Sequence, residues 1–271
     1  MSGEAPQVKE KAQLQFGMDD PDFAAIHLQL CKTLDAAGGI PMVVSGLSQA
    51  PNRLVPTRSD APKAAGLTMN ASTSEGVQTF DMFVLPGLSQ ASPVGVMPYQ
   101  GNRISGFLSL NPSWEGVICL PGPTTHWALI SADEVVSFQS FLTASMVRAA
   151  LYDAGVRAES WNTQALENSV ADTISRPELT AARLAEAVAG KALNSEDALD
   201  AAGKIWGTLL GAELAAARPY WLGQNLAVIG PNDLATAYVT ALKAQGLSAT
   251  VADDERMCLA GLIEVWRQRG S

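Results

Sequence analysis

The stretch that decides the fold is Val117–Phe141, VICLPGPTTHWALISADEVVSFQSF. It holds three apolar segments of strand length, Val117–Leu120, Trp127–Ile130 and Val135–Phe141. Pro121–Thr125 separates the first two segments and Ala132–Glu134 the last two, and both separators are rich in turn-forming residues. The stretch therefore predicts three consecutive antiparallel strands.

Downstream of this stretch, the pattern predicts helices and then an alternation of strands and helices. The predicted helices before Pro219 are Ala144–Tyr152, much of Ser160–Thr173, Ser175–Gly190 and Ser195–Arg218. The alternating elements are a strand over Asn225–Ile229, a helix over Asp233–Gln245, a strand over Ser248–Val251 and a helix over Glu255–Arg269. A three-strand meander followed by such an alternation predicts a mixed sheet covered by helices, in the ribonuclease-H-like order.

Local signals refine the helices of this second half. Ser175 with Glu178 has the spacing of a capping box, and Ser195 is the predicted N-cap of the long apolar helix. Gly207 and Gly211 stand four apart on that helix, which indicates close helix packing.

Upstream, the pattern gives only the later part of the same order. Apolar residues at three-to-four spacing predict a helix over Pro21–Ala37, and buried strands are predicted over Ile40–Val44 and Asp81–Leu85. Ala50–Thr79 is rich in Pro, Ser and Thr with little periodicity, which predicts a long surface loop. A helix is predicted around Arg103–Leu110, and the opening hairpin of the ribonuclease-H-like order is not found.

Composition narrows the class of protein. Twenty-seven acidic residues against 18 Lys and Arg give a net charge of −9, with 47% apolar and 17% charged residues. This balance excludes a disordered chain and disfavours nucleic acid as a partner. Without an apolar run long enough for a membrane, or a signal peptide in Met1–Lys11, we expect a cytoplasmic protein with no membrane partner. The three cysteines lie far apart and are predicted to be unpaired.

The turn after the first strand of the meander is the main candidate site. Gly122 with Thr124 and Thr125 can present amides and hydroxyls to a phosphate, because such turns form anion-binding concavities. An ordinary hairpin turn is the alternative.

Other kinds of site have less support. Gly-Leu-Ser-Gln-Ala occurs at Gly46–Ala50 and again at Gly87–Ala91, but a nucleophile elbow needs Gly at the last position, so both are predicted to be strand-end turns. The two histidines and three cysteines lack ligand spacing, and no metal site is predicted. His27 is predicted to be a packed or solvent-facing residue of the first helix.

Several motifs together resemble the 2-dehydro-3-deoxygalactonokinase (KDGal kinase) family. The motifs are FVLPGL from Phe83, VICLPGPTTHW from Val117, FQSFLT from Phe138, LLGAE from Leu209, AVIGPNDLA from Ala227 with Tyr238, and LAGL from Leu259. They keep their order from about Ile40 to the C-terminus. The resemblance implies an α/β protein with two actin-like domains, a reduced N-terminal one over residues 1–112 and a C-terminal one over residues 113–271. It also implies ATP with Mg²⁺ as cofactors, and a six-carbon 2-keto-3-deoxy sugar acid as the substrate phosphorylated at its terminal hydroxyl.

The resemblance also implies roles for particular residues. Gly122, Thr124, Thr125 and His126 correspond to the family's second phosphate loop, in which His126 replaces a lysine. Gly230 and Pro231 would flank the adenine of the nucleotide. Arg53 would face the substrate carboxylate.

Departures from the family fall where the chemistry takes place. Asn102 and Arg103 occupy the family's acidic pair, the Thr-Gly-Glu motif has become Thr143-Ala-Ser145, and the first phosphate loop, Asp-x-Gly-Thr, has no match. Phosphoryl transfer needs Mg²⁺ and cations to neutralise charge, and a carboxylate to orient the attacking hydroxyl.

We therefore expect a KDGal-kinase-like protein with impaired phosphoryl transfer. One alternative is a catalytically inactive binding or assembly partner, with a second copy or another chain covering the sheet edge that the absent hairpin would leave. The other is an active kinase whose reading frame begins further upstream.

Overall fold

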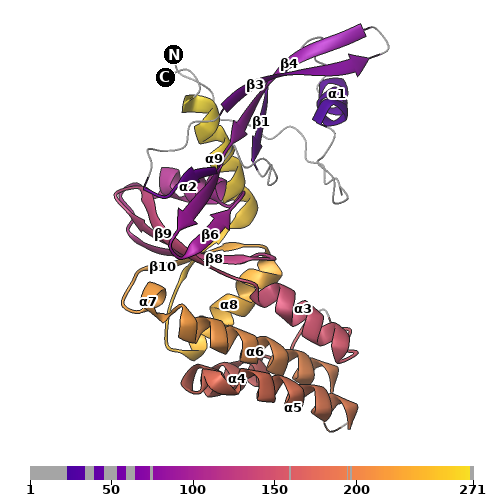
Figure 1. Cartoon of the computed structure of the whole chain (residues 1–271), viewed down its shortest axis with the longest axis vertical. Helices are drawn as coiled ribbons and strands as arrows, with labels where there is room; N and C mark the ends of the chain where they lie inside the picture. The colour runs from indigo at the N-terminus through magenta and orange to yellow at the C-terminus, as the bar shows by residue number, and fades with distance from the viewer. Residues whose placement is uncertain are drawn as a thin grey trace.

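The computed structural model describes residues 23–33, 40–45, 54–58, 65–73, 76–158, 160–193, 195 and 197–268. Figure 1 shows an elongated arrangement, with a helical layer at one end and a five-stranded sheet in the middle. A three-stranded sheet lies at the other end, and the last helix, α9 (Asp254–Gln268), runs between the two sheets.

The five-stranded sheet confirms the predicted meander and alternation. Its strands are β7 (Gly116–Leu120), β8 (Thr125–Ser131), β9 (Glu134–Phe141), β10 (Leu226–Gly230) and β11 (Thr250–Asp253). Their order is β11-β10-β7-β8-β9, with β7–β8 and β8–β9 antiparallel and β10 parallel to both β7 and β11. This is the ribonuclease-H-like order. Every residue of β7 and β10 is buried, because elements pack on both faces of the sheet.

Helices from the second half of the chain cover one face. They are α3 (Thr143–Asp153), α4 (Thr163–Ser175), the 3₁₀ turn η2 (Pro177–Leu179), α5 (Thr180–Ala192), α6 (Ala198–Ala216), α7 (Arg218–Trp221) and α8 (Asn232–Ala244). Val117, Cys119 and Trp127 of the sheet share one buried cluster with Leu166 and Ile205 of the helices. The close packing predicted at Gly207 is confirmed, since a Cβ there would lie 2.3 Å from the Leu166 carbonyl oxygen of α4.

Two predicted helix starts are wrong. Ser175 lies at the end of α4, where its hydroxyl donates to the Asp172 carbonyl, and α5 begins only after the 3₁₀ turn at Pro177. The N-cap of α6 is Asp197, whose carboxylate accepts from the Asp200 amide at 2.8 Å, rather than Ser195. Asp197 therefore takes the capping role predicted for Ser195, whereas α5, with Leu179 as its N-cap residue, begins without a side-chain cap.

The opposite face of the sheet packs against α2 (Gly101–Leu110) and α9. Ile118 of the sheet, Phe107 of α2 and Met257 of α9 belong to one buried cluster. The two helices cross in contact at glycines. A Cβ on Gly106 would lie 1.9 Å from the Met257 carbonyl oxygen, and one on Gly261 would lie 1.8 Å from the Asn102 carbonyl oxygen. The helices α2 and α9 come from opposite sides of the predicted domain boundary at 112/113 and pack closely on each other. The division into two domains at this boundary therefore stays a prediction.

The first half of the chain forms two smaller sheets. One has the order β1-β4-β3, from β1 (Met42–Ser45), β3 (Ala65–Thr73) and β4 (Gly76–Leu85), and α1 (Phe23–Thr33) lies against β3. The other has the order β2-β5-β6, from β2 (Leu54–Pro56), β5 (Gly87–Ala91) and β6 (Val94–Met97). The Gln90 side chain joins this second sheet to β9, because Nε2 donates to the Phe138 carbonyl at 2.9 Å and Oε1 accepts from the Phe138 amide at 2.8 Å.

The N-terminal helix and both strands predicted in this half are confirmed over their described residues. His27 is packed, buried against the Phe80 ring with ring centroids 3.8 Å apart.

The loop predicted over Ala50–Thr79 is wrong. That range contains β2, β3 and the beginning of β4, and β3 pairs with β4 along nine residues. Backbone pairing with a neighbouring strand holds this segment, and such pairing does not need the apolar alternation on which the prediction relied. The strand-end turn predicted at Gly87–Ala91 is also wrong, since these residues form β5, whereas Gly46–Ala50 lies outside the described residues.

Among the helices of the described ranges, none is both long and apolar enough to cross a membrane. The expectation about an opening hairpin concerns the first 22 residues, which lie outside those ranges.

Candidate functional site

Three chain segments meet where the parallel strands of the five-stranded sheet end. We call this place the carboxyl edge: Pro121–Thr124 after β7, Gly230–Pro231 at the end of β10, and Asp253–Asp254 at the end of β11. Gly230 is paired with Asp253, and a Cβ on Gly230 would lie 2.8 Å from the Pro121 carbonyl oxygen. The structure therefore brings together the predicted phosphate loop and the predicted nucleotide-binding residues.

The start of α2 completes the carboxyl edge from the first half of the chain. Gln100, the residue before α2, is buried, and its Nε2 lies 3.9 Å from where a Cβ on Gly122 would stand. Tyr99 accepts a hydrogen bond at its carbonyl from the Ser45 hydroxyl at the end of β1, at 3.2 Å. The ends of strands from both halves therefore approach one helix start.

Exposure varies within the loop, from the buried Gly122 to the exposed Pro123. Gly122 is buried and closely packed, since a Cβ there would lie 3.1 Å from the Thr124 carbonyl oxygen. Thr124 is half-buried. Pro231 is exposed, and α8 begins directly after it without a side-chain cap. Backbone donors at a turn and at a helix start suit an anionic phosphate.

Thr125 lies at the end of the loop but points into the protein. Its side chain is fully buried, and its Oγ1 lies 2.7 Å from the Tyr238 hydroxyl of α8. Tyr238 donates in turn to Oε2 of Glu213 at 2.8 Å. Because the Tyr238 proton goes to the carboxylate, Thr125 donates to Tyr238, and its hydroxyl proton is not available to a ligand.

His126, which is predicted to stand at a lysine position of the family, contributes no positive charge. The ring is fully buried, with Nδ1 2.8 Å from the Ser140 hydroxyl and no hydrogen-bond partner for Nε2. Burial lowers the pKa of His126 to about 4, so the ring is neutral at physiological pH. The predicted His126–phosphate contact would have to be made without a positive charge.

Asn102 and Arg103, which are predicted to occupy the family's acidic positions, are hydrogen-bonded to α9. Arg103 makes a two-pronged pair with Asp254, in which Nη2 lies 2.9 Å from Oδ2, and this hydrogen-bonded pair raises the pKa of Arg103. Asn102 is buried and donates from Nδ2 to Cys258 Sγ at 3.0 Å, whereas its Oδ1 has no hydrogen-bond partner. These residues join two helices and place no free carboxylate at the carboxyl edge.

The side chains at the carboxyl edge do not form a set of ligands that would hold a magnesium ion. Asp254 is paired with Arg103, and the Asp253 carboxylate accepts from the Arg256 amide at 2.7 Å. Over the described ranges, no three His, Cys, Asp or Glu side chains gather in a metal-binding group. A lone amide oxygen such as Asn102 Oδ1 is a weak substitute for the carboxylates that magnesium prefers.

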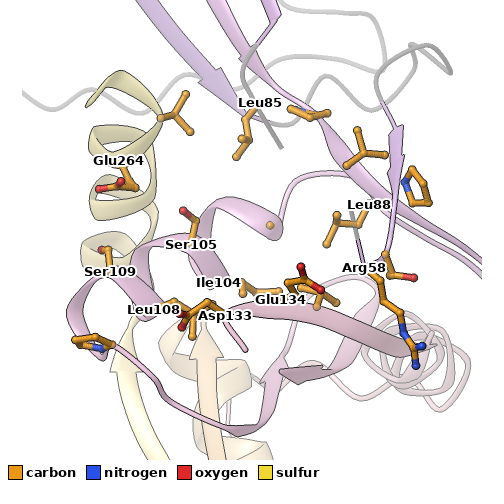
Figure 2. A pocket seen from close by; sticks show the side chains of 18 residues that line it. Arg58, Leu85, Leu88, Ile104, Ser105, Leu108, Ser109, Asp133, Glu134 and Glu264 are labelled. Carbon is orange, nitrogen blue, oxygen red and sulfur yellow. The ribbon is translucent and has the colours of Figure 1, made fainter. Parts of the chain in front are cut away.

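A separate pocket of about 500 Å³ lies along α2, and sequence reasoning missed it. It runs from Gly101, the first residue of α2, toward the β8–β9 turn, which is at the opposite end of β8 from the Pro121–Thr124 loop. Figure 2 shows Arg58 and Glu264 on opposite sides, with Asp133 and Glu134 between them and Leu85 and Leu88 above. No local motif signals this pocket, because its lining comes from five separate parts of the chain. Arg53, the predicted carboxylate-binding residue, lies outside the described residues.

The sheet order and the loops gathered at its carboxyl edge define the class: an α/β protein with a ribonuclease-H-like sheet and a candidate phosphate-binding edge. A family profile described as 2-keto-3-deoxy-galactonokinase matches residues 3–265. A curated Rhizobium meliloti (strain 1021) protein, named Probable 2-dehydro-3-deoxygalactonokinase DgoK1, is 28% identical over 192 residues. That match covers 67% of this chain and 63% of the relative, less than two thirds of its length.

A solved structure shows the same fold. It is of a Sinorhizobium meliloti protein provisionally assigned as a 2-dehydro-3-deoxygalactonokinase, and it matches with a TM-score of 0.78 and 23% identity. The match covers 90% of this chain and 84% of that one. With the profile spanning nearly all of the sequence, the chain belongs to the 2-keto-3-deoxy-galactonokinase family.

Proposed function

We propose that this chain is a sugar-acid kinase homologue that binds ATP at the carboxyl edge and whose phosphoryl transfer is impaired. The observation that carries the proposal is the pairing of Arg103 with Asp254 and of Asn102 with Cys258, at the two positions where the resemblance leads us to expect an acidic pair. Family membership supports a nucleotide and a 2-keto-3-deoxy sugar acid as the ligands.

In this proposal, the nucleotide phosphates lie at the Gly122–Thr124 backbone, and the Thr124 hydroxyl contributes a further donor. Gly230 and Pro231 flank the adenine, as the resemblance implies. Mg²⁺ would arrive bound to the phosphates and neutralise part of their charge, since it keeps several waters in such sites. The residues available at the carboxyl edge can bind and orient a nucleotide. These residues do not include a general base that could accept the proton of the acceptor hydroxyl.

The pocket along α2 is the proposed place for the sugar acid. It begins at Gly101, next to Gln100, which adjoins the phosphate loop. Its lining supplies a guanidinium from Arg58, hydroxyls from Ser105 and Ser109, and three carboxylates. A hydroxylated acid matches this combination, with its carboxylate on Arg58 and its hydroxyls donating to the acidic side chains.

Calorimetric titration and a coupled ADP-release assay test this function. We expect heat on adding ATP·Mg²⁺ to the wild-type chain, and ADP release with 2-dehydro-3-deoxygalactonate that stays at the level of a protein-free blank. Thr124→Ala and Gly122→Ala should weaken ATP binding by about tenfold or more, about 1.4 kcal/mol. Thr180→Ala, on the distant α5, is the matched control and should bind like wild type.

Two outcomes would contradict the proposal. ADP release by the wild-type chain that Thr124→Ala abolishes would show intact catalysis. Absence of heat with both ATP·Mg²⁺ and the sugar acid would favour an assembly role instead.

The assembly role has an observation of its own. In the described part of the first three-stranded sheet, β1 is an edge strand that pairs with β4 alone. An edge of this kind can accept a strand from another chain. Light scattering that gives twice the chain mass would support this second candidate, and a monomer at all concentrations would oppose it.

A further inference from the structure

A buried acidic side chain lies beneath the carboxyl edge and takes no direct part in the proposed binding. Glu213, in the last turn of α6, is 3% exposed. Its hydrogen-bond partners are neutral groups: Trp127 Nε1 donates to Oε1 at 2.7 Å, Tyr238 donates to Oε2 at 2.8 Å, and the Thr143 side chain also bonds it. Burial raises the pKa of Glu213, and the donors oppose this shift. Burial also raises the pKa of Tyr238, and the neighbouring Glu213 raises it further.

This hydrogen-bonded group connects two of the segments of the carboxyl edge with the start of α3. Thr125, bonded to Tyr238 at 2.7 Å, ends the phosphate loop. Tyr238 belongs to α8, which begins after Gly230–Pro231. Thr143 is the first residue of α3, directly after β9. One carboxylate therefore links the loop, the nucleotide-side helix and the helix that follows the meander.

Stability alone does not account for this arrangement. Removing a carboxylate from water is costly, and apolar residues of similar volume often stabilise a protein as well as a buried ionic group does. A directional chain from Thr125 through Tyr238 to Glu213 does, however, fix the end of the loop relative to α8. Apolar contacts would hold the same segments without fixing that orientation.

We propose that Glu213 and Tyr238 are positioning residues, which hold the phosphate loop against α8 through Thr125. This inference rests on the proposed nucleotide site. Tyr238→Phe removes the link between Thr125 and Glu213 while keeping the ring, and Thr125→Val removes it from the other end. Thr125→Ser keeps the hydroxyl and should restore the wild-type behaviour. Tyr220→Phe is the matched control, because the Tyr220 hydroxyl bonds Ser137 at 3.3 Å, away from this network.

Two measurements decide the inference. Hydrogen exchange of the amides in Gly122–Trp127 should be about tenfold faster in Tyr238→Phe and Thr125→Val than in wild type, and unchanged in Tyr220→Phe and Thr125→Ser. Titration with ATP·Mg²⁺ should show affinity about tenfold weaker in the same two variants, with the melting temperature of each compared against Tyr220→Phe. A purely structural role would lower the melting temperature and leave the affinity of the folded protein unchanged.

Unchanged exchange or unchanged affinity in Tyr238→Phe and Thr125→Val would overturn the inference. Wild-type protein that gives no heat with ATP·Mg²⁺ would instead refute the nucleotide site itself, and loop exchange would then decide whether the network holds the loop. Glu213→Gln provides a second route if the other variants fail to fold. Its amide keeps the size and accepts from Trp127 through Oε1, but Nε2 cannot accept from Tyr238, so amide exchange in Gly122–Trp127 should be faster than in wild type.

Discussion

At the carboxyl edge, individual polar side chains form hydrogen bonds with one another. Thr125 donates to Tyr238, Arg103 pairs with Asp254, and Asn102 donates to Cys258. Asn102 Oδ1 and His126 Nε2 are buried side-chain polar atoms without a hydrogen-bond partner in the described structure, and both belong to residues predicted to correspond to family site positions. Polar groups that are already bonded to one another fix the shape of the carboxyl edge but do not stabilise the charge that develops in phosphoryl transfer.

His126 gives a prediction about pH. Its pKa falls from 6.5 to about 4 on folding, so the unfolded chain binds more protons than the folded one between these values. The stability that neutral His126 contributes is present above about pH 6.5 and is lost as the pH falls toward 4, by up to about 3 kcal/mol. In His126→Gln, the free energy of unfolding should lack this part of the pH dependence. Urea unfolding of both proteins from pH 4 to 7 measures the difference, and parallel curves would show that His126 titrates normally.

His126 also shows how much a local sequence motif can predict about a single residue. The sequence predicts that His126 replaces a lysine of the family, because His126 stands in a recognisable motif. Its burial and its bond to Ser140 were not predictable, since Ser140 belongs to the next strand and only the register of β8 on β9 brings the two together.

Among the elements, α2 and α9 decide how closely the two halves of the chain approach. Their crossing depends on Gly106 and Gly261, where each helix meets the backbone of the other. Side chains at these positions would push the helices apart and displace Asn102 and Arg103 from their partners on α9.

This crossing predicts a contrast between two glycines of one helix. Gly106→Ala would place its Cβ 1.9 Å from a backbone oxygen, so we expect a loss of about 3 kcal/mol or more in the free energy of unfolding. Gly101→Ala meets no atom within 4 Å and should stay within about 1 kcal/mol of wild type. Denaturant unfolding measures both variants. Equal stability of the two would mean that α2 and α9 do not cross at this distance.

Elements with a strong apolar period were predicted well, and elements held by their neighbours were not. The meander and the last four elements follow from periodicity and turn residues. β3 and the start of β4 were predicted as a loop, because cross-strand pairing rather than apolar alternation holds them.

In the whole molecule, α9 connects the first half of the chain to the five-stranded sheet. It follows β11 directly and crosses α2, and its Trp266 packs edge-on against Phe83 of β4, with ring centroids 5.9 Å apart. The last helix of the chain therefore stabilises strands that begin some two hundred residues earlier.

Because of this connection, we expect the two halves to unfold together. Urea unfolding followed by tryptophan fluorescence and by far-ultraviolet circular dichroism should give a single, coincident transition. In Trp266→Ala, the first half should lose its support, and hydrogen exchange in β4 should become faster while exchange in β7 remains slow. Two separate transitions in the wild-type protein would show that α9 does not couple the halves.

The sequence by itself determined the family, the order of elements in the second half and the location of the loop at the end of β7. These features depend on local patterns, which can be recognised in the amino-acid sequence alone. Only the tertiary structure decided that Thr125 and His126 point inward, that Arg103 is paired with Asp254, and that a pocket lies along α2. Each of these features depends on which distant segments pack together. The packing energy of a residue is set by its neighbours in space, and these can stand more than a hundred positions away in the sequence.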